Sequence, residues 1–122
     1  MSLDISVRRL DNVAVVDLSG RITLGEASGR LRDTIKDLVT NGSKDILLNL
    51  AGVTYMDSSG LGELVGAFAT VSNRGGKLKL QGLQPRLYEL MHITKLYSVF
   101  EIFTDEAAAV KSFGTGGAAA KG

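Results

Sequence analysis

The sequence predicts an α/β domain with a mostly parallel sheet, an antiparallel hairpin at its N-terminal edge and about four helices. Short apolar runs alternate along the chain with longer stretches of helical periodicity. This alternation is typical of a parallel sheet with right-handed crossover helices. The first two strand-like segments are separated only by Asp11 and Asn12, which favour a hairpin turn. The length of 122 residues suits one compact domain.

The N-terminal half supplies the hairpin, a first helix and a central strand. Residues 13–16 carry apolar side chains on both faces of the strand, which suits a strand covered on each side. Asn41 and Gly42 tolerate the left-handed conformation at a helix end, so they should terminate the first helix. The expected elements of this half are strands at 5–10, 13–18 and 46–50, a loop at 19–25 and a helix at 26–39.

The C-terminal half continues the alternation and completes the order β-β-α-β-α-β-α-β-α. Lys77–Gln81 alternates strictly between charged or polar and apolar residues, as a strand with one exposed face does. Pro85 suits the first turn of a helix. The expected elements are helices at 59–74, from 85 onward and at 105–113, with strands at 77–81 and 99–103. We expect the domain to span residues 1–113 and residues 114–122 to form a flexible tail.

Composition excludes several classes of function. The formal net charge is +1, from 14 basic and 13 acidic residues, and the chain has no run of Lys and Arg. We therefore expect no binding to nucleic acid or to an anionic membrane surface. There is no cysteine, so a disulfide, a thiolate nucleophile and a cysteine-held metal are all excluded. No segment approaches the roughly 20 apolar residues of a membrane span, and the N-terminus does not look like a signal peptide. A cytoplasmic location, no metal and no cofactor are the expectations.

The most informative segment reads V-T-Y-M-D-S-S-G-L-G and covers residues 53–62. It places Asp57, Ser58 and Ser59 where an apolar strand passes into a helix. The first backbone N–H groups of a helix have no partner within the helix and carry partial positive charge. A hydroxyl at this position can cap the helix, bind an anion or accept a phosphate group.

Two enzymatic or ligand-binding interpretations fit this segment poorly. A hydrolase nucleophile elbow needs a glycine two residues before its serine, but Met56 and Asp57 stand at those places. The one histidine, His92, is more typical of a structural residue than of a catalytic base. A dinucleotide fingerprint would need its last glycine one residue earlier than Gly66. Close backbone packing, or close approach of a partner, is the preferred role of the glycines in this stretch.

A regulated phosphoserine is the remaining interpretation beside a simple helix cap. Phosphorylation adds about −1.5 to −2 charges, which a helix N-terminus can accept without unfolding. The same charge inside a partner interface would oppose binding. A desolvation penalty of about 4 kcal/mol would weaken the affinity roughly a thousandfold. Physical reasoning permits both the cap and the phosphate acceptor and does not choose between them.

Several motifs together resemble the STAS domain family, and in particular the stand-alone bacterial anti-sigma-factor antagonists. The resemblance covers about residues 7–113 and includes the strand-to-helix segment described above. The motifs are Leu18-Ser19-Gly20, Asp45–Leu50, Tyr55–Gly62, and Gly75-Gly76 before Lys77-Leu78. The family fold implied by these motifs agrees with the order of elements that periodicity predicts.

The resemblance implies a function that composition and spacing alone do not supply. Members of this family bind an anti-sigma factor that is also a serine kinase. The kinase phosphorylates the first serine of the D-S-S-G motif, here Ser58, and a serine phosphatase reverses the modification. The antagonist itself would not be an enzyme. The resemblance also implies that Ser59 caps the helix and that Asp57 contacts the partner or stabilises the loop, with Gly60 and Gly62 shaping the same segment.

One departure from the family pattern concerns the loop after the second strand. Many antagonists carry an acidic residue at the place of Thr23, whereas here Arg21 supplies a basic side chain nearby. Partner recognition is therefore expected to differ from the typical pair. The alternatives are a STAS signalling or scaffold module in a pathway without a sigma factor, and a small nucleotide-binding domain. The oligomeric state is left open. The central expectation is that the Ser58 hydroxyl lies in solvent at the helix N-terminus.

Overall fold

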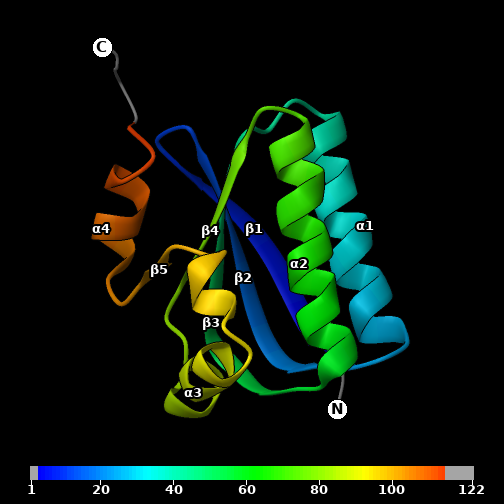
Figure 1. The fold of residues 1–122 in the computed structure, drawn as a ribbon. Helices are drawn as coiled ribbons and strands as arrows, with labels where there is room; N and C mark the ends of the chain where they lie inside the picture. Colours follow the sequence, from blue (N-terminus) through cyan, green and yellow to red (C-terminus); the bar gives the residue numbers. More distant parts are fainter. Residues whose placement is uncertain (1–2, 115–122) are drawn as a thin grey trace.

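The computed structural model describes residues 3–114 and contains one five-stranded sheet with four α-helices and a short 3₁₀ helix (Figure 1). The N-terminal elements are β1 (Leu3–Leu10), β2 (Val13–Ile22), α1 (Glu26–Thr40), β3 (Asp45–Met56) and α2 (Ser58–Asn73). The C-terminal elements are β4 (Lys77–Gln81), α3 (Pro85–Ile93), η1 (Leu96–Ser98), β5 (Ile102–Phe103) and α4 (Glu106–Lys111).

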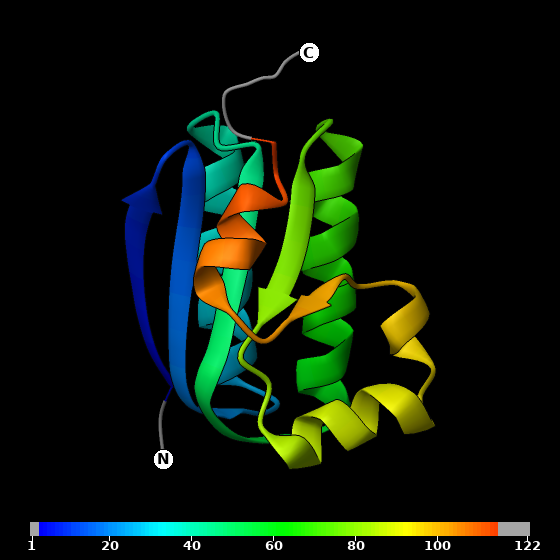
Figure 2. The same ribbon diagram turned by 90° about the vertical axis from the view of Figure 1, so that its left-hand side faces the viewer.

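The strands lie side by side in the order in which they occur in the chain. β1 pairs with β2 in the antiparallel sense, and β2, β3, β4 and β5 pair in parallel. The helices α1 and α2 cover one face of the sheet and α4 lies on the other face (Figures 1 and 2). This arrangement confirms the predicted α/β class with a mostly parallel sheet and an N-terminal antiparallel hairpin.

The hydrophobic core is divided by the sheet into two clusters of unequal size. Along β2, Ala14 and Val16 face the large cluster beneath α1 and α2, whereas Val13 and Val15 face the small cluster beneath α4. All four side chains are fully buried. The alternation follows from the two-residue repeat of a strand, which turns successive side chains to opposite faces. The expectation that this strand is covered on both faces is confirmed.

The second strand extends further than the sequence predicted. Residues 19–22, expected in a loop, continue β2 beside the end of β3, where Ile22 pairs with Met56. Two register shifts interrupt the ladder, and Gly20 adopts a positive φ of 116°. These irregularities explain why the sequence of this segment was interpreted as a loop. Hydrogen bonds from the neighbouring strand nevertheless hold it in the sheet, so the loop prediction was wrong for these residues.

The C-terminal segment also differs from the prediction in its details. A strand was expected at residues 99–103, but β5 contains only Ile102 and Phe103 and is preceded by η1. The last helix is shorter than expected and spans Glu106–Lys111. The flexible tail predicted for residues 114–122 lies, apart from Gly114, outside the described residues. Within residues 3–114, no helix is both long enough and apolar enough to cross a membrane.

The topology brings several loops to one end of the sheet. The junction between β3 and α2 lies at this end, and α3 lies there too (Figures 1 and 2). The loop that follows β2 is tied to the same junction, because the backbone N–H of Asp57 donates to the carbonyl oxygen of Ile22 at 3.3 Å. This end of the molecule corresponds to the carboxyl ends of β2 and β3, where α/β sheets commonly place their functional residues.

Candidate functional site

The strand-to-helix junction predicted from the sequence is present and has a sharp boundary. β3 ends at Met56, Asp57 has extended backbone angles (φ −96°, ψ −174°), and α2 begins at Ser58. Asp57 is therefore the N-cap residue of α2. One residue separates the last strand position from the first helical one, so the side chain at position 58 emerges directly at the positive end of the helix.

The Asp57 carboxylate joins the helix to the neighbouring loop. One of its oxygens, Oδ1, accepts the backbone N–H of Gly60 at 2.8 Å, and the other, Oδ2, accepts the backbone N–H of Leu24 at 3.1 Å. The N–H groups of Gly60 and then Leu24 stabilise the charged form, so they hold the pKa of Asp57 below its usual range. Asp57 thus fixes the first turn of α2 against the loop between β2 and α1.

The helix cap is not the residue that the sequence analysis expected. Ser59 was assigned as the cap, but it is the second residue of α2 and is half-buried. The capping position requires an extended backbone, and the end of β3 provides that conformation at Asp57 instead. Because Asp57 satisfies the first turn, capping does not require either serine hydroxyl.

Ser58 is the first residue of α2 and is exposed to solvent. Within residues 3–114, its side chain forms no hydrogen bond with another part of the protein. The expectation that residue 58 lies at the surface at the start of the helix, and not in the core, is confirmed. The arrangement is suited to the addition of a bulky anionic group, because the side chain is accessible and lies beside the positive end of α2.

The glycines of the motif have different surroundings. Gly60 is buried, and a Cβ atom there would collide with the carbonyl oxygen of Ile22 and lie 2.6 Å from Cγ of Met56. A Cβ atom at Gly62 or Gly66 would meet nothing within 4 Å. Gly60 therefore permits close packing of α2 against β2, as expected. Gly62 and Gly66 have no such role within the described chain.

Arg21 and Thr23 lie on the strand and loop next to the junction. Arg21 pairs in register with Tyr55, and its guanidinium carbon lies 4.7 Å from the centre of the Tyr55 ring. The carbonyl oxygen of Thr23 accepts the backbone N–H of Ser28 at 3.2 Å and its hydroxyl at 2.8 Å. Thr23 therefore shapes the start of α1 through its backbone, while Arg21 presents a cation at the surface.

Two apolar side chains beside the motif were not singled out from the sequence. Leu24 is 77% exposed and directly follows Thr23, and Tyr55 is 39% exposed at the end of β3. The available signal for Leu24 was its place between Thr23 and Gly25, just before the expected helix, where no regular element was predicted to bury it. The role of Tyr55 depends on its non-local pairing with Arg21, which sequence reasoning does not supply.

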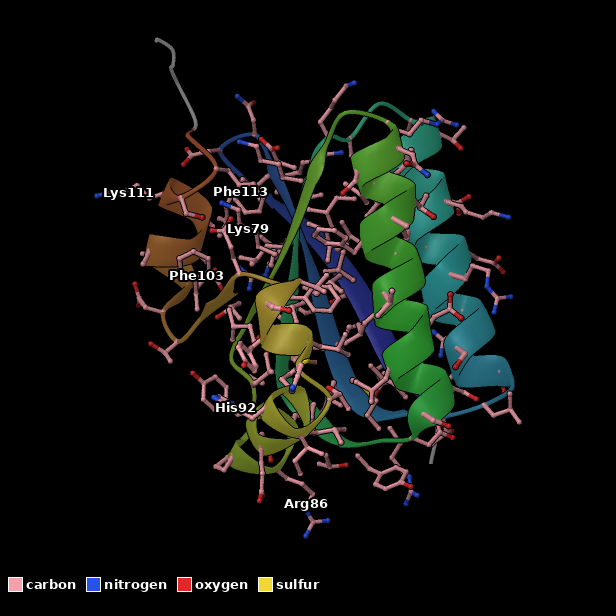
Figure 3. The ribbon with its side chains drawn as sticks, viewed as in Figure 1. Lys79, Arg86, His92, Phe103, Lys111 and Phe113 are labelled. Atoms are coloured by element: carbon pink, nitrogen blue, oxygen red, sulfur yellow. The ribbon has the colours of Figure 1, made fainter. Side chains whose placement is uncertain are left out.

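His92 does not join this site. It lies on α3 (Figure 3). The centre of its ring is 5.2 Å from that of Tyr88 and 5.0 Å from that of Tyr97. Within the described residues, its side-chain hydrogen bond is with the carbonyl oxygen of Tyr88, so no dyad with Ser58 is formed. The glycines of the supposed dinucleotide fingerprint lie inside α2 and not in a loop before it. No group of three or more potential metal ligands occurs among residues 3–114.

Comparison with known proteins identifies the same family that the motifs suggested. The model of the STAS domain matches residues 4–109. The anti-sigma-B factor antagonist of Bacillus subtilis (strain 168) is 35% identical over 111 residues, which cover 91% of this chain and 100% of that protein.

Solved structures share the fold at lower sequence identity. An anti-sigma factor antagonist from Mycobacterium paratuberculosis has a TM-score of 0.79 and 21% identity, covering 92% of this chain and 94% of its own. The phosphorylated form of the Bacillus cell fate determinant SpoIIAA has a TM-score of 0.69 and 21% identity, covering 89% and 99% respectively. The chain therefore has a known fold, shared with both of these solved structures.

Proposed function

Since this chain belongs to the STAS domain family, we propose that it is an anti-sigma-factor antagonist switched by phosphorylation of Ser58. In its unmodified form it binds an anti-sigma factor that is also a serine kinase, and it thereby regulates transcription. The name of the Bacillus subtilis relative supports the antagonist role. That SpoIIAA, a protein of similar fold, exists in a phosphorylated form supports the switch.

The observation that carries the proposal is the exposed Ser58 beside a cap made by another residue. Asp57 satisfies the first turn of α2 through its bond to Gly60, so the Ser58 hydroxyl can be modified without loss of the cap. The helix N-terminus then accommodates the added negative charge within the folded protein. Binding is lost because the phosphate must leave water when the partner covers it. A penalty of about 4 kcal/mol corresponds to roughly a thousandfold in affinity.

The remaining features of the proposal follow from the separate roles of the kinase and the antagonist. The kinase supplies ATP and magnesium, so the antagonist needs no metal or cofactor and is not an enzyme. A serine phosphatase restores the active form. We place the functional module in residues 1–113 and the protein in the cytoplasm. Neither nucleic acid nor a membrane takes part in the binding.

Phosphate transfer from the cognate kinase tests the proposal. The wild-type protein, the Ser58→Ala variant and the Ser59→Ala variant would each be incubated with the kinase, ATP and Mg²⁺, and intact masses recorded. We expect one phosphate on the wild type and on Ser59→Ala, and none on Ser58→Ala. Ser59→Ala is the matched control, because it removes the neighbouring hydroxyl of the same motif.

Two outcomes would contradict the proposed function. If Ser58→Ala were phosphorylated as fully as the wild type, another residue would be the phosphate acceptor. Complete absence of kinase binding and of phosphate on the wild type would favour a scaffold in a pathway without a sigma factor.

A further inference from the structure

A groove lies beside the junction, between the end of β3 and α3. Its volume is about 330 Å³, and its lining includes Tyr55, Met56, Arg86, Glu89 and Ile93. Met56 immediately precedes the cap residue of α2, so the groove begins two residues before Ser58 in the chain. The groove and the proposed phosphorylation site therefore belong to one continuous end of the molecule.

The walls of the groove are apolar and accessible. Ile93 is 70% exposed at the last position of α3, and Tyr55 is 39% exposed, whereas Met56 is buried. A volume of 330 Å³ lies at the lower limit of cofactor and drug sites, which commonly span about 300–1,000 Å³. It is better suited to one or two protein side chains. Adjacent exposed apolar side chains on a buried floor are typical of a protein–protein contact.

The rim of the groove carries positive charge that the protein does not neutralise. Within residues 3–114, Arg86 forms no ion pair and no side-chain hydrogen bond, and its side chain extends away from α3 into solvent (Figure 3). Within the same residues Arg21 forms no ion pair either, and its guanidinium carbon lies 4.7 Å from the centre of the Tyr55 ring on the opposite wall. By contrast, Arg32 is paired with Glu63 at 2.8 Å. Glu89 is the one carboxylate in the lining of the groove.

The position of Arg86 is not explained by the stability of α3. It is the second residue of the helix, directly after Pro85, and the first turn contains no acidic residue. A cation at a helix N-terminus is unfavourable, because the backbone there already carries partial positive charge. An arginine in this place therefore points to a role in recognition and not in folding.

We infer that this groove receives a segment of the serine-kinase partner in which an aliphatic or aromatic side chain lies next to a carboxylate. The apolar side chain packs between Tyr55 and Ile93, and the carboxylate meets Arg86 at the rim. The inference rests on the proposed function and adds to it a second contact, separate from Ser58. This contact anchors the partner beside the hydroxyl that it modifies.

Binding of the kinase to four variants tests the inference. Ile93→Ser removes the apolar wall, and Arg86→Glu reverses the charge at the rim. We expect each to raise the Kd at least about tenfold, the effect of losing one buried aliphatic side chain or one charge-assisted contact. Arg86→Glu should not unfold the protein, because glutamate is favoured in the first turn of a helix.

Two matched variants serve as controls. Tyr88→Ser changes an exposed apolar residue of α3 outside the groove, and Lys111→Glu makes the same charge reversal on α4 (Figure 3). Both should bind within about twofold of the wild type. The Kd of the wild type should also rise with salt concentration, and Arg86→Glu should reduce or invert that dependence.

Several results would overturn the inference, and they separate it from the proposed function. If the wild type binds the kinase and Ile93→Ser binds equally well, the groove is not an anchor, although the antagonist role stands. Tighter binding by Arg86→Glu would mean that the partner segment is basic. A change in self-association of Ile93→Ser, with unchanged kinase binding, would assign the groove to a second copy of this chain. If the wild type does not bind the kinase at all, both proposals fail.

Discussion

The face beneath α4 and the end of the sheet around Ser58 use similar residues in opposite ways. On the α4 face, Arg8 forms ion pairs with Asp17 at 2.6 Å and with Glu106 at 2.7 Å, which join β1, β2 and α4. At the Ser58 end, Arg21 has only an aromatic ring as its partner within the described residues. One arginine is therefore satisfied inside the chain, and the other remains available to another protein.

The contrast extends to a lysine and its aromatic neighbours under α4. Lys79 is only 6% exposed, and its ammonium group donates to the carbonyl oxygen of Ser112 at 3.1 Å. The same group lies 4.7 Å from the centre of the Phe113 ring and 5.8 Å from that of Phe103 (Figure 3). At the Ser58 end, equally apolar side chains stand in solvent. Substitutions under α4 should therefore alter stability, and substitutions around Ser58 should alter binding.

Gly60→Ala is expected to have the largest effect on stability. Gly60 is therefore the position at the Ser58 end where a substitution should alter folding as well as binding. The new methyl group would collide with the backbone of Ile22, so α2 must shift at its first turn. Overpacking of this kind costs about 1–3 kcal/mol. Urea unfolding would measure the loss. Gly62→Ala is the matched control, because its surroundings are open and the change should stabilise the helix by about 0.5–1 kcal/mol. Equal stability of the two variants would contradict the packing argument.

Arg8→Ala should remove the ion pairs of the α4 face with a smaller loss. These side chains are partly exposed, so the two pairs together contribute about 1 kcal/mol. Arg8 lowers the pKa of Asp17 and of Glu106, so both carboxyls stabilise the fold when ionised. Their contribution is complete above the ordinary carboxyl pKa of about 4 and is lost as the pH falls through the lower folded values.

Stability measured between neutral and acid pH checks this prediction. The difference between the wild type and Arg8→Ala should be largest near neutral pH and should shrink in acid. Kinase affinity should not change, because the α4 face lies on the opposite side of the sheet from α1 and α2. A difference in stability that grows as the pH falls would contradict the assigned sign.

Asp57→Asn should have a milder effect than the loss of Arg8. Asparagine is a good N-cap, but its one side-chain oxygen cannot reproduce both carboxylate bonds, to Gly60 and to Leu24. Because these N–H groups lower the pKa of Asp57, its charge stabilises the fold above the unfolded pKa, and this is lost as the pH falls through the folded pKa. The Tm of the variant should be lower than that of the wild type at neutral pH and converge with it in acid. A constant difference in Tm would argue against the charge of Asp57 as the cause.

Arg21→Ala should have the smallest effect on folding, and it sharpens the comparison with Arg8. An exposed cation–π contact contributes about 0.5–1 kcal/mol at most. The variant should therefore unfold close to the wild type but bind the kinase more weakly, with a reduced dependence on salt. Calorimetric binding and urea unfolding of the two arginine variants would separate recognition from stability. The opposite pattern would mean that the two regions have been assigned the wrong roles.

Local patterns were sufficient to predict the fold class and the position of the strand-to-helix junction. The two-residue and helical repeats predicted each main element, and the motif at Asp57–Gly60 predicted an exposed serine where strand meets helix. The exposed face expected for residues 77–81 was wrong, because Lys79 and Gln81 are buried. Features that depend on distant parts of the chain were missed. The extension of β2 through Ile22 needs β3 beside it. The choice of Asp57 over Ser59 as the cap is set by where β3 ends.

The groove between β3 and α3 could not be inferred from the sequence for the same reason. Tyr55 and Ile93 are 38 positions apart in the sequence (93 − 55). They line the same groove only because α3 lies at the carboxyl end of β3. The position of Arg86 after Pro85 could have raised the question of recognition, since a cation there does not favour a helix. Only the fold shows which apolar side chains it accompanies.

The affinity of the kinase for the protein before and after stoichiometric phosphorylation at Ser58 tests the central claim most directly. We expect the Kd to rise about a thousandfold, because the phosphate must lose its water when the partner covers it. The circular dichroism spectrum should not change, because the helix N-terminus accommodates the phosphate in the folded protein. Equal affinity of the two forms, or unfolding of the phosphorylated form, would contradict the switch.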